Sequence, residues 1–433
     1  MLVPSAASEQ TGSVSGGQPR RFRFWLVRRL WVVLALLGLI AGAVLMFHPH
    51  LQAWYHRRAA RLELQRYHTL QAVRHLQICR EIWPRDPEVL LLAARAARCI
   101  RVYGDSERLL QIYREVRGRD QAHTLEQLLL FAECQAGEVA EQCWSRVEKG
   151  DADAPLYLEA LMRGYLRQYR LGKARLCLDR WKQLQPDNPQ ALYLEGLVWL
   201  DYLHDRAAAV NCYRRVLELD PDHEEARLGL AVALLMGKDF AGAAEHFQLL
   251  LQCQPDNLRL QVGLAECLDG LDQTAEAVRL VDDVLAQQPG FVAALSLRGQ
   301  IALKSEQWTE AESWLREAIR RDPSDHRARY SLILCLERSG QEEEARRQRK
   351  ALQQMEEDLS RFNEIVTRDI VQRPTDPALH CTLGQLLLRG GHREEGIRWL
   401  QSALHLDPNY APARQALADC LSQAQRQAQP SSP

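Results

Sequence analysis

The 433-residue sequence lacks the motifs by which most enzymes hold a phosphate, a metal or an activated nucleophile. It has no Gly-rich phosphate loop, no His-Glu-x-x-His, no Gly-x-Ser-x-Gly and no Cys-x-x-Cys-His haem motif. Each of these motifs places a backbone or side-chain group where one kind of chemistry needs it. Without them the sequence indicates a protein that is not an enzyme and that holds no cofactor.

An excess of charge of one sign is also missing. Lys and Arg total 55 and Asp and Glu total 56, so the formal net charge is −1. A nucleic-acid surface needs a strongly basic domain, so this balance argues against a nucleic-acid partner. Aromatic residues make up 7% of the chain, and no strand-like run lies between Gly-rich turns. We therefore expect an all-α fold.

The eleven cysteines show no metal-ligand spacing. Cys143, Cys177 and Cys212 recur at steps of 34 and 35 residues, which predicts small buried hydrophobic side chains rather than ligands. His75 and Cys79 are four residues apart, so one helix face could present both to a metal ion. Two ligands alone make a poor metal site, and no metal is predicted.

What the sequence does contain is a period of 34 residues, clearest from Glu224 to Asp325. Three prolines keep the step: Pro255, Pro289 and Pro323. Five alanines keep it too: Ala209, Ala243, Ala277, Ala311 and Ala345. Four positions after an alanine comes a large apolar residue: Tyr213, Phe247, Val281 and Leu315. An ordinary helical bundle has no reason to keep small residues in step, so the period predicts repeated helical hairpins.

This pattern resembles the tetratricopeptide repeat, a helix–turn–helix unit of that length. The two amphipathic helices of one unit cannot bury their apolar stripes alone, so successive units stack. The resemblance implies an all-α, right-handed superhelical solenoid over residues 53–410, built of about ten repeats. A capping helix over 411–427 then closes the array, and residues 428–433 are expected to be disordered.

A candidate membrane anchor precedes the repeats. Residues 1–19 are rich in Ser, Gly and Gln and predict a disordered tail, and 20–50 comprise a basic flank and an apolar run over 30–47. A run of this length spans about 27 Å as a helix, close to the thickness of a bilayer core. Five arginines precede it: Arg20, Arg21, Arg23, Arg28 and Arg29. The positive-inside rule then keeps the N-terminal tail cytoplasmic and exports the repeats, to the periplasm if the protein is bacterial.

Two observations compete with this interpretation. Ala41-Gly42-Ala43 has the small-x-small form of a signal-peptide cleavage site, although the apolar segment runs on to Phe47. Eleven thiols are also more usual in a reducing compartment than in an exported domain. The uniform apolar character of the run favours an anchor over a buried core helix.

The period breaks once, after Gly340. No Gly or Pro lies between Gly340 and Pro374, which predicts one long helix over about 341–371. Its apolar residues step by three or four and share one face: Leu352, Met355, Leu359, Phe362, Val366 and Ile370. We expect the final repeat, at 377–408, to cover this face. Self-association of two chains through the same helix is the alternative.

The resemblance further implies a peptide- or protein-binding face lined by the first helix of each repeat. On this register the apolar lining residues are Tyr193, Leu197, Leu228, Val232, Leu235, Met236 and Val262. Charged residues flank them: Arg163 and Arg167 on one side, Glu266 and Asp269 on the other. Some of these leucines could instead pack against their neighbours. The function expected is a membrane-tethered interaction scaffold, for example in assembly of an envelope complex. The alternative is a regulatory or accessory subunit of an enzyme, or an enzyme with a site on the repeat surface.

Overall fold

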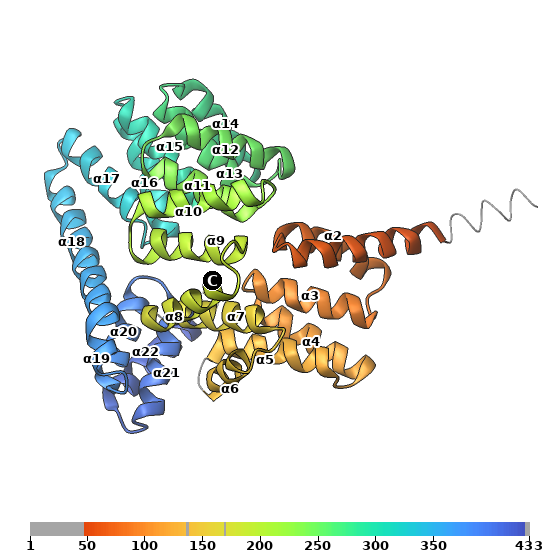
Figure 1. Ribbon diagram of the computed structural model, residues 1–433. Helices are drawn as coiled ribbons and strands as arrows, with labels where there is room; N and C mark the ends of the chain where they lie inside the picture. Colours follow the sequence, from red (N-terminus) through yellow and green to blue (C-terminus); the bar gives the residue numbers. More distant parts are fainter. Residues whose placement is uncertain (1–46, 136–137, 169, 429–433) are drawn as a thin grey trace, which may run out of the picture. The chain divides into compact units, whose positions relative to one another are not determined.

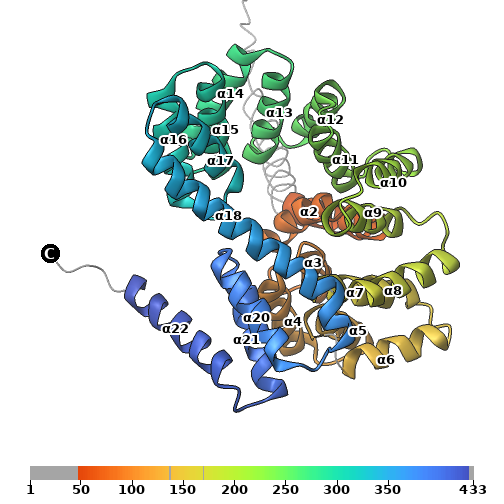
Figure 2. The same cartoon turned by 90° about the vertical axis from the view of Figure 1, so that its left-hand side faces the viewer.

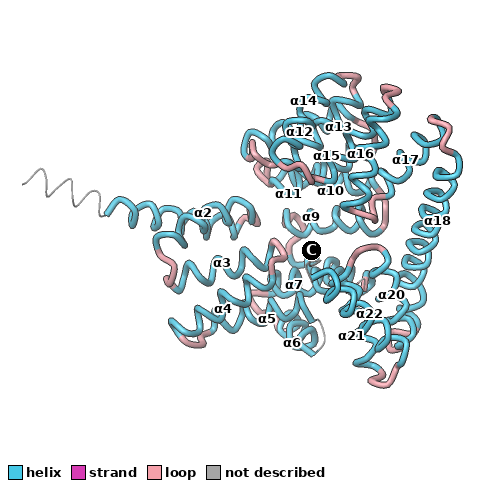
Figure 3. Tube along the Cα trace, turned by 180° about the vertical axis from the view of Figure 1, so that it is seen from behind, coloured by secondary structure: helices cyan, strands magenta, loops and turns pink. Residues whose placement is uncertain are grey.

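The computed structural model describes residues 47–135, 138–168 and 170–428. Every regular element within those ranges is a helix, and none is a strand (Figure 3). The chain divides after Gly118 into two compact units. The all-α fold and the helical repeat solenoid predicted from the sequence are confirmed for the part of the chain that the structure describes.

The first unit is a short stack of helices. Residues 47–65 are helical and are followed by α2 (Thr69–Ile82), α3 (Pro87–Cys99) and α4 (Tyr103–Arg117). The α3 helix begins at Asp86, whose Oδ1 accepts a hydrogen bond from the Val89 N–H at 2.9 Å. Pro87 follows at the first helical position, where its missing N–H costs nothing.

The second unit holds most of the repeats (Figure 1). It begins with α5 (Gln121–Gln135), α6 (Glu138–Glu148), α7 (Ala154–Arg167), α8 (Leu171–Leu184), α9 (Pro189–Leu197), the π-helical turn η1 (Val198–Tyr202) and α10 (Arg206–Leu219). It continues with α11 (Glu224–Met236), α12 (Phe240–Cys253), α13 (Leu258–Gly270), α14 (Thr274–Gln287), α15 (Val292–Lys304), α16 (Trp308–Arg321) and α17 (His326–Arg338). It ends with α18 (Glu342–Glu364), the π-helical turn η2 (Ile365–Asp369), α19 (Ile370–Gln372), α20 (Pro377–Arg389), α21 (Arg393–Leu406) and α22 (Ala411–Ala428).

Pairs of consecutive helices form the repeats, and their cores explain the residues that recur in the sequence. The five alanines in step are at most 1% exposed. The Tyr213 ring fills the space beside two glycines: a Cβ on Gly196 would lie 2.7 Å from its Cε1, and one on Gly229 would lie 2.6 Å from its Cζ. At these two close approaches, a glycine on one helix makes room for the large Tyr213 ring on the other.

The turn inside each of these repeats also recurs every 34 residues. The residues with positive φ are Lys238, Asp272, Glu306 and Gly340, at 62°, 61°, 60° and 77°. After the left-handed residue Asp272, the N–H of Gln273 donates to the Leu268 carbonyl at 2.9 Å, which closes the end of α13. The left-handed conformation costs a non-glycine residue about 1 kcal/mol. The helix packing on both sides of the turn offsets that cost.

The long helix predicted over 341–371 corresponds to α18, η2 and α19, which follow one another without a break (Figure 2). Ile365 and Val366 are buried in one cluster with Leu379, Leu383 and Leu386 of α20. The final repeat therefore covers the C-terminal part of the long helix from within the chain. Nearer its middle, Leu359 is 50% exposed.

An ion pair also joins the long helix to the final repeat. The Arg389 guanidinium of α20 donates from Nε to Asp358 Oδ2 at 2.6 Å and from Nη2 to Oδ1 at 2.9 Å. This two-point contact holds the pKa of the Asp358 carboxyl below its usual range. No sign of the pairing is visible in the sequence, because the two residues are 31 positions apart.

The predicted N-terminal tail and the apolar run over 30–47 lie outside the described residues, apart from Phe47. Among the helices of residues 47–428 that the structure does describe, none is long and apolar enough to cross a membrane. The predicted capping helix over 411–427 corresponds to α22.

Candidate functional site

The first helices of successive repeats pack side by side in the second unit. The α9 helix contacts α11, α13 contacts α15, and α15 contacts α17. Arg327 of α17 reaches past α15 and donates from Nη2 to Glu266 Oε1 of α13 at 2.5 Å. Since Glu266 is a predicted lining residue, this contact places Arg327 on the same surface. We call this surface the first-helix face: the lining positions of α9, α11, α13, α15 and α17.

The apolar part of the first-helix face lies on α9 and α11. Met236 is 51% exposed, while Leu197 is half-buried. Four further predicted residues are half-buried and pack against the core around Ala209 and Phe247: Tyr193, Leu228, Val232 and Leu235. The α11 side chains therefore pack against the core and also leave part of their surface exposed to a partner. Both alternatives that the sequence left open apply to them.

The structure buries two of the predicted lining residues. Val262 is 6% exposed and belongs to the core that α13 shares with α14 and α15. Arg163 is 9% exposed, and its Nε and Nη2 donate to Glu159 Oε1 at 3.0 and 2.9 Å. The prediction that these two residues are exposed to a partner was wrong, because Val262 packs into the core and Arg163 is paired in a buried position with Glu159 of its own helix.

The Arg163–Glu159 pair is completed from the next repeat. The Gln190 amide at the start of α9 donates to the same Glu159 oxygen at 2.9 Å. The three groups form a buried hydrogen-bonded network that joins α7 to α9. Arg167, one turn further along α7, is partly buried, and its Nη1 lies 3.7 Å from Cys134 Sγ. The basic flank of the predicted groove is thus largely structural.

The acidic residues predicted to flank the groove, Glu266 and Asp269, form ion pairs with basic residues that the sequence analysis did not predict. Lys304 of α15 lies 3.5 Å from Asp269 Oδ1 and 3.3 Å from Asp272 Oδ1. Tyr330 of α17 is 56% exposed. The period could have revealed Lys304, which lies two steps of 34 after the exposed Met236. The first-helix face therefore continues from an apolar part on α9 and α11 to a polar part on α13, α15 and α17.

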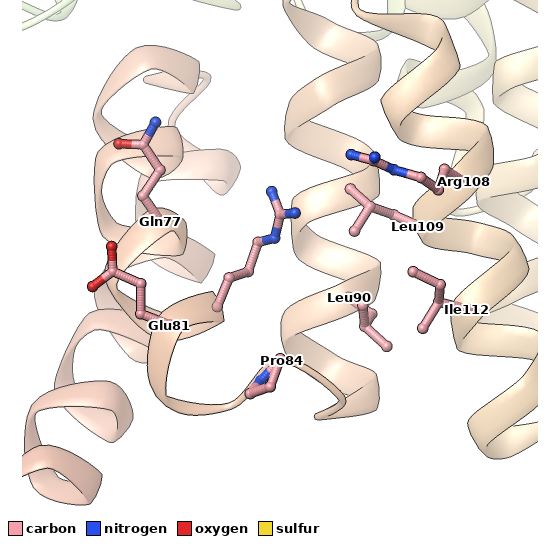
Figure 4. Close-up of a pocket in the computed structure, with 8 residues that line it drawn as sticks. Gln77, Glu81, Pro84, Leu90, Arg108, Leu109 and Ile112 are labelled. Carbon is pink, nitrogen blue, oxygen red and sulfur yellow. The ribbon is translucent and has the colours of Figure 1, made fainter.

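A separate cavity of about 720 Å³ lies in the first unit, between α2, α3 and α4 (Figure 4). It is lined by Gln77, Arg80, Glu81, Pro84, Leu90, Arg108, Leu109 and Ile112. Arg108 is already paired with Asp105 at 2.9 Å. The lining includes no nucleophile beside a base and no group of metal ligands, so it indicates no chemistry.

Nor do the histidines and cysteines of the described residues form a metal site with three or more ligands. Cys79 is buried and its Sγ donates to the Ala53 carbonyl at 3.4 Å, while His75 Nδ1 lies 2.8 Å from His56 Nδ1. The two residues considered as shared ligands thus make separate contacts.

All eleven cysteines are free thiols. Cys143 and Cys177 are buried, as the repeat position predicts, and Cys212 is partly buried. Burial raises the pKa of Cys143 to about 11 and that of Cys177 to about 12. Thiols with such pKa values are almost entirely protonated at neutral pH, so they are poor nucleophiles and poor candidates for catalysis.

Family models match the middle part of the chain. Residues 200–257 and 302–349 match one family model described as tetratricopeptide repeat, and residues 234–301 match another. The matched ranges overlap at 234–257 and adjoin at 301 and 302, so together they cover residues 200–349 without a gap. This region contains the α11, α13, α15 and α17 parts of the first-helix face.

The chain is also similar to two curated proteins of the DnaJ group. It is 33% identical over 163 residues to DnaJ protein P58IPK homolog B of Oryza sativa subsp. japonica, which is 34% of each chain. It is 30% identical over 193 residues to the DnaJ homolog subfamily C member 7 homolog of Schizosaccharomyces pombe, which is 41% of this chain and 40% of the relative. The match thus spans 34% of the length of the first relative and 40% of the length of the second.

Solved structures show a more distant likeness. A tetratricopeptide repeat protein from Parabacteroides merdae is 15% identical, with 66% of this chain and 99% of that chain covered and a TM-score of 0.35.

Proposed function

We propose that this protein is a membrane-tethered scaffold that binds a protein or peptide partner on the first-helix face. The observation that carries the proposal is the partly exposed apolar surface of α11, next to the polar residues of α13, α15 and α17. Met236 leaves half of its surface open at 51% exposure. An apolar patch with a polar rim is the arrangement by which partner proteins are held.

The two parts of the face suggest two kinds of contact. Apolar side chains of a partner would bury the exposed atoms of Met236 and of the half-buried α11 residues. Beyond them Glu266, Asp269, Lys304 and Arg327 are already joined in ion pairs. Paired charges of both signs orient a polar segment through hydrogen bonds rather than attract one sign of charge. We therefore expect a partner segment with apolar residues at one end and uncharged polar residues at the other.

The proposed role is not enzymatic. Helices take up nearly all of the described residues, and the first-helix face offers packing and hydrogen bonds rather than a reactive group. The alternative, an accessory or regulatory subunit of an enzyme, would use the same surface. The identity of the captured partner distinguishes the two.

Site-specific photo-crosslinking tests the proposed binding face. A photoreactive residue at position 236 of the full chain should give an adduct with one defined protein. The matched control is position 249, where Leu249 of α12 is 37% exposed outside the face. Met236→Glu should then reduce capture of that protein by about tenfold or more, since burial of one large side chain contributes about 1.5–3 kcal/mol. Equal adducts from positions 236 and 249 would refute the assignment.

The tether is proposed from the apolar run over 30–47 and the five arginines before it. We propose that the repeats are exported. In an oxidising compartment their thiols must resist oxidation, and most of them are buried, which protects them. A phosphatase active only outside the cytoplasm, fused after residue 427, should be active. If a cytoplasmic reporter is active there instead, the repeats face the other side of the membrane.

A further inference from the structure

The helix of residues 47–65 in the first unit has two faces of different character. Ala53 and Ala60 are fully buried and Leu64 is 9% exposed. The Cys79 thiol of α2 donates to the Ala53 carbonyl at 3.4 Å, so this face packs on α2. The packed side is made of small residues, which lets the two helices approach closely.

The opposite side is apolar but uncovered. Its large residues are Phe47, Leu51, Trp54, Tyr55 and Leu62, exposed by 59%, 65%, 49%, 62% and 46%. Their spacing of one, three, four and seven positions places them on one stripe of the helix. We call these five residues the exposed apolar face. It is the densest group of exposed large apolar side chains among the described residues.

Positive charge accompanies this face. Arg58 lies over the Trp54 ring, with its guanidinium carbon 5.9 Å from the ring centre, and is exposed. Arg61 is exposed one turn further on and pairs with Glu88. From residue 47 to residue 62 the sequence has no Asp or Glu. Cations beside exposed Trp, Tyr, Phe and Leu are the composition of helices that lie in the headgroup region of anionic bilayers.

We infer that the exposed apolar face docks in the surface of an anionic phospholipid bilayer. The inference rests on the proposed tether, because in the sequence the apolar run over 30–47 leads directly into the exposed apolar face. A chain that leaves a bilayer at residue 47 has this face at the headgroup level without any linker. A second copy of the chain is the weaker occupant, since it would bring the arginines of two chains together.

The consequence for the scaffold is orientation. A helix held flat on the bilayer by Leu51, Trp54 and Tyr55, and packed through Ala53 and Ala60 on α2, fixes the first unit against the membrane. The first unit would then have one defined side toward lipid and the other free for partners.

Vesicle binding of the full chain tests the docking separately from the tether. The double substitution Leu36→Arg/Leu37→Arg disrupts the apolar run, so that any remaining binding reports on the described residues. This chain should sediment with vesicles of phosphatidylcholine and phosphatidylglycerol, and only weakly with phosphatidylcholine alone. Adding Leu51→Glu/Tyr55→Glu should weaken binding by about tenfold or more. Adding Arg58→Gln should weaken binding to the anionic vesicles by roughly fivefold, because Arg58 is exposed whereas Arg61 is paired with Glu88.

Two further measurements complete the test. Ile78→Glu on α2 changes an exposed apolar residue outside the face, which is 36% exposed, and should leave vesicle binding unchanged. Tryptophan emission should shift to shorter wavelength when anionic vesicles are added, and Trp54→Phe should remove most of that shift. The circular dichroism of every variant should match that of the parent chain, because each substituted side chain of the face is exposed.

The proposal is overturned if anionic vesicles do not bind, or if the substitutions on the exposed apolar face leave binding unchanged. A dimer in solution that Leu51→Glu/Tyr55→Glu abolishes would also overturn it and assign the face to a second copy. Alkaline extraction of membranes containing the unsubstituted chain tests the tether by itself. Release of the chain there counts against the apolar run as an anchor and leaves the vesicle result standing.

Discussion

Truncation of Ile365 tests how the long helix is stabilised. Ile365 is fully buried at the point where η2 meets α20, in a cluster with Leu379, Leu383 and Leu386. Ile365→Ala removes a large part of a buried side chain and leaves a cavity. We expect the local free energy of unfolding to fall by about 2–5 kcal/mol. Leu359→Ala on the same helix is the matched control, since Leu359 is 50% exposed. Leu359→Ala should change the free energy of unfolding by no more than about 0.5 kcal/mol.

The effect should be local, because a repeat array is stabilised by contacts between neighbours. Amide hydrogen exchange measures it. Exchange in α20 should rise by about thirtyfold to several thousandfold in Ile365→Ala, which is 2–5 kcal/mol at about 1.4 kcal/mol per tenfold. Exchange in α12, several repeats away, should be unchanged.

Three results would contradict this reasoning. The first is an equal rise in α12 and α20, which would mean that the unit opens as a whole. The second is a larger effect from Leu359→Ala than from Ile365→Ala. The third is a dimer, seen by analytical ultracentrifugation, that Leu359→Asp dissociates. That result would show that a second chain, and not α20, covers the long helix.

Three other predictions follow from single contacts. Gly263→Ala places a Cβ 2.6 Å from Cζ of the buried Phe247 ring and should destabilise the second unit by about 1–3 kcal/mol in urea unfolding, while Gly172→Ala, with no atom within 4 Å, should be neutral or stabilising. His380 donates from Nε2 to the Pro374 carbonyl and accepts at Nδ1 from Ser402, each at 2.9 Å, and burial lowers its pKa. The unfolded chain therefore takes up a proton on this imidazole more readily than the folded chain does. The contribution of His380 to the free energy of unfolding is full above about pH 6.5 and is lost as the pH falls below it. His380→Gln should make the melting temperature depend less on pH in this range. Iodoacetamide at neutral pH should label exposed Cys253 first and Cys177 only after unfolding; rapid labelling of Cys177 in the native protein would refute its burial.

Some features of this protein follow from the sequence alone. The period, the small residues at Ala243 and Ala277 and the long segment without Gly or Pro after Gly340 predict the helices and their stacking. Such features depend on residues three or four positions apart, or one repeat apart, and these distances can be read directly from the sequence. The same 34-residue register also predicted that Met236 and Glu266 lie on the first-helix face.

Other features were decided only in the tertiary structure. The sequence placed Arg163 and Val262 on an exposed surface, but both are buried in the folded chain. It gave no sign that Arg327 would reach Glu266, 61 residues earlier, or that a charged residue such as Glu306 would take a left-handed conformation. The position of a residue within the repeat determines only the direction in which its side chain points from its own helix. Whether that side chain is free, paired or covered depends on what the next repeat places in front of it, as Gln190 does for the Arg163–Glu159 pair.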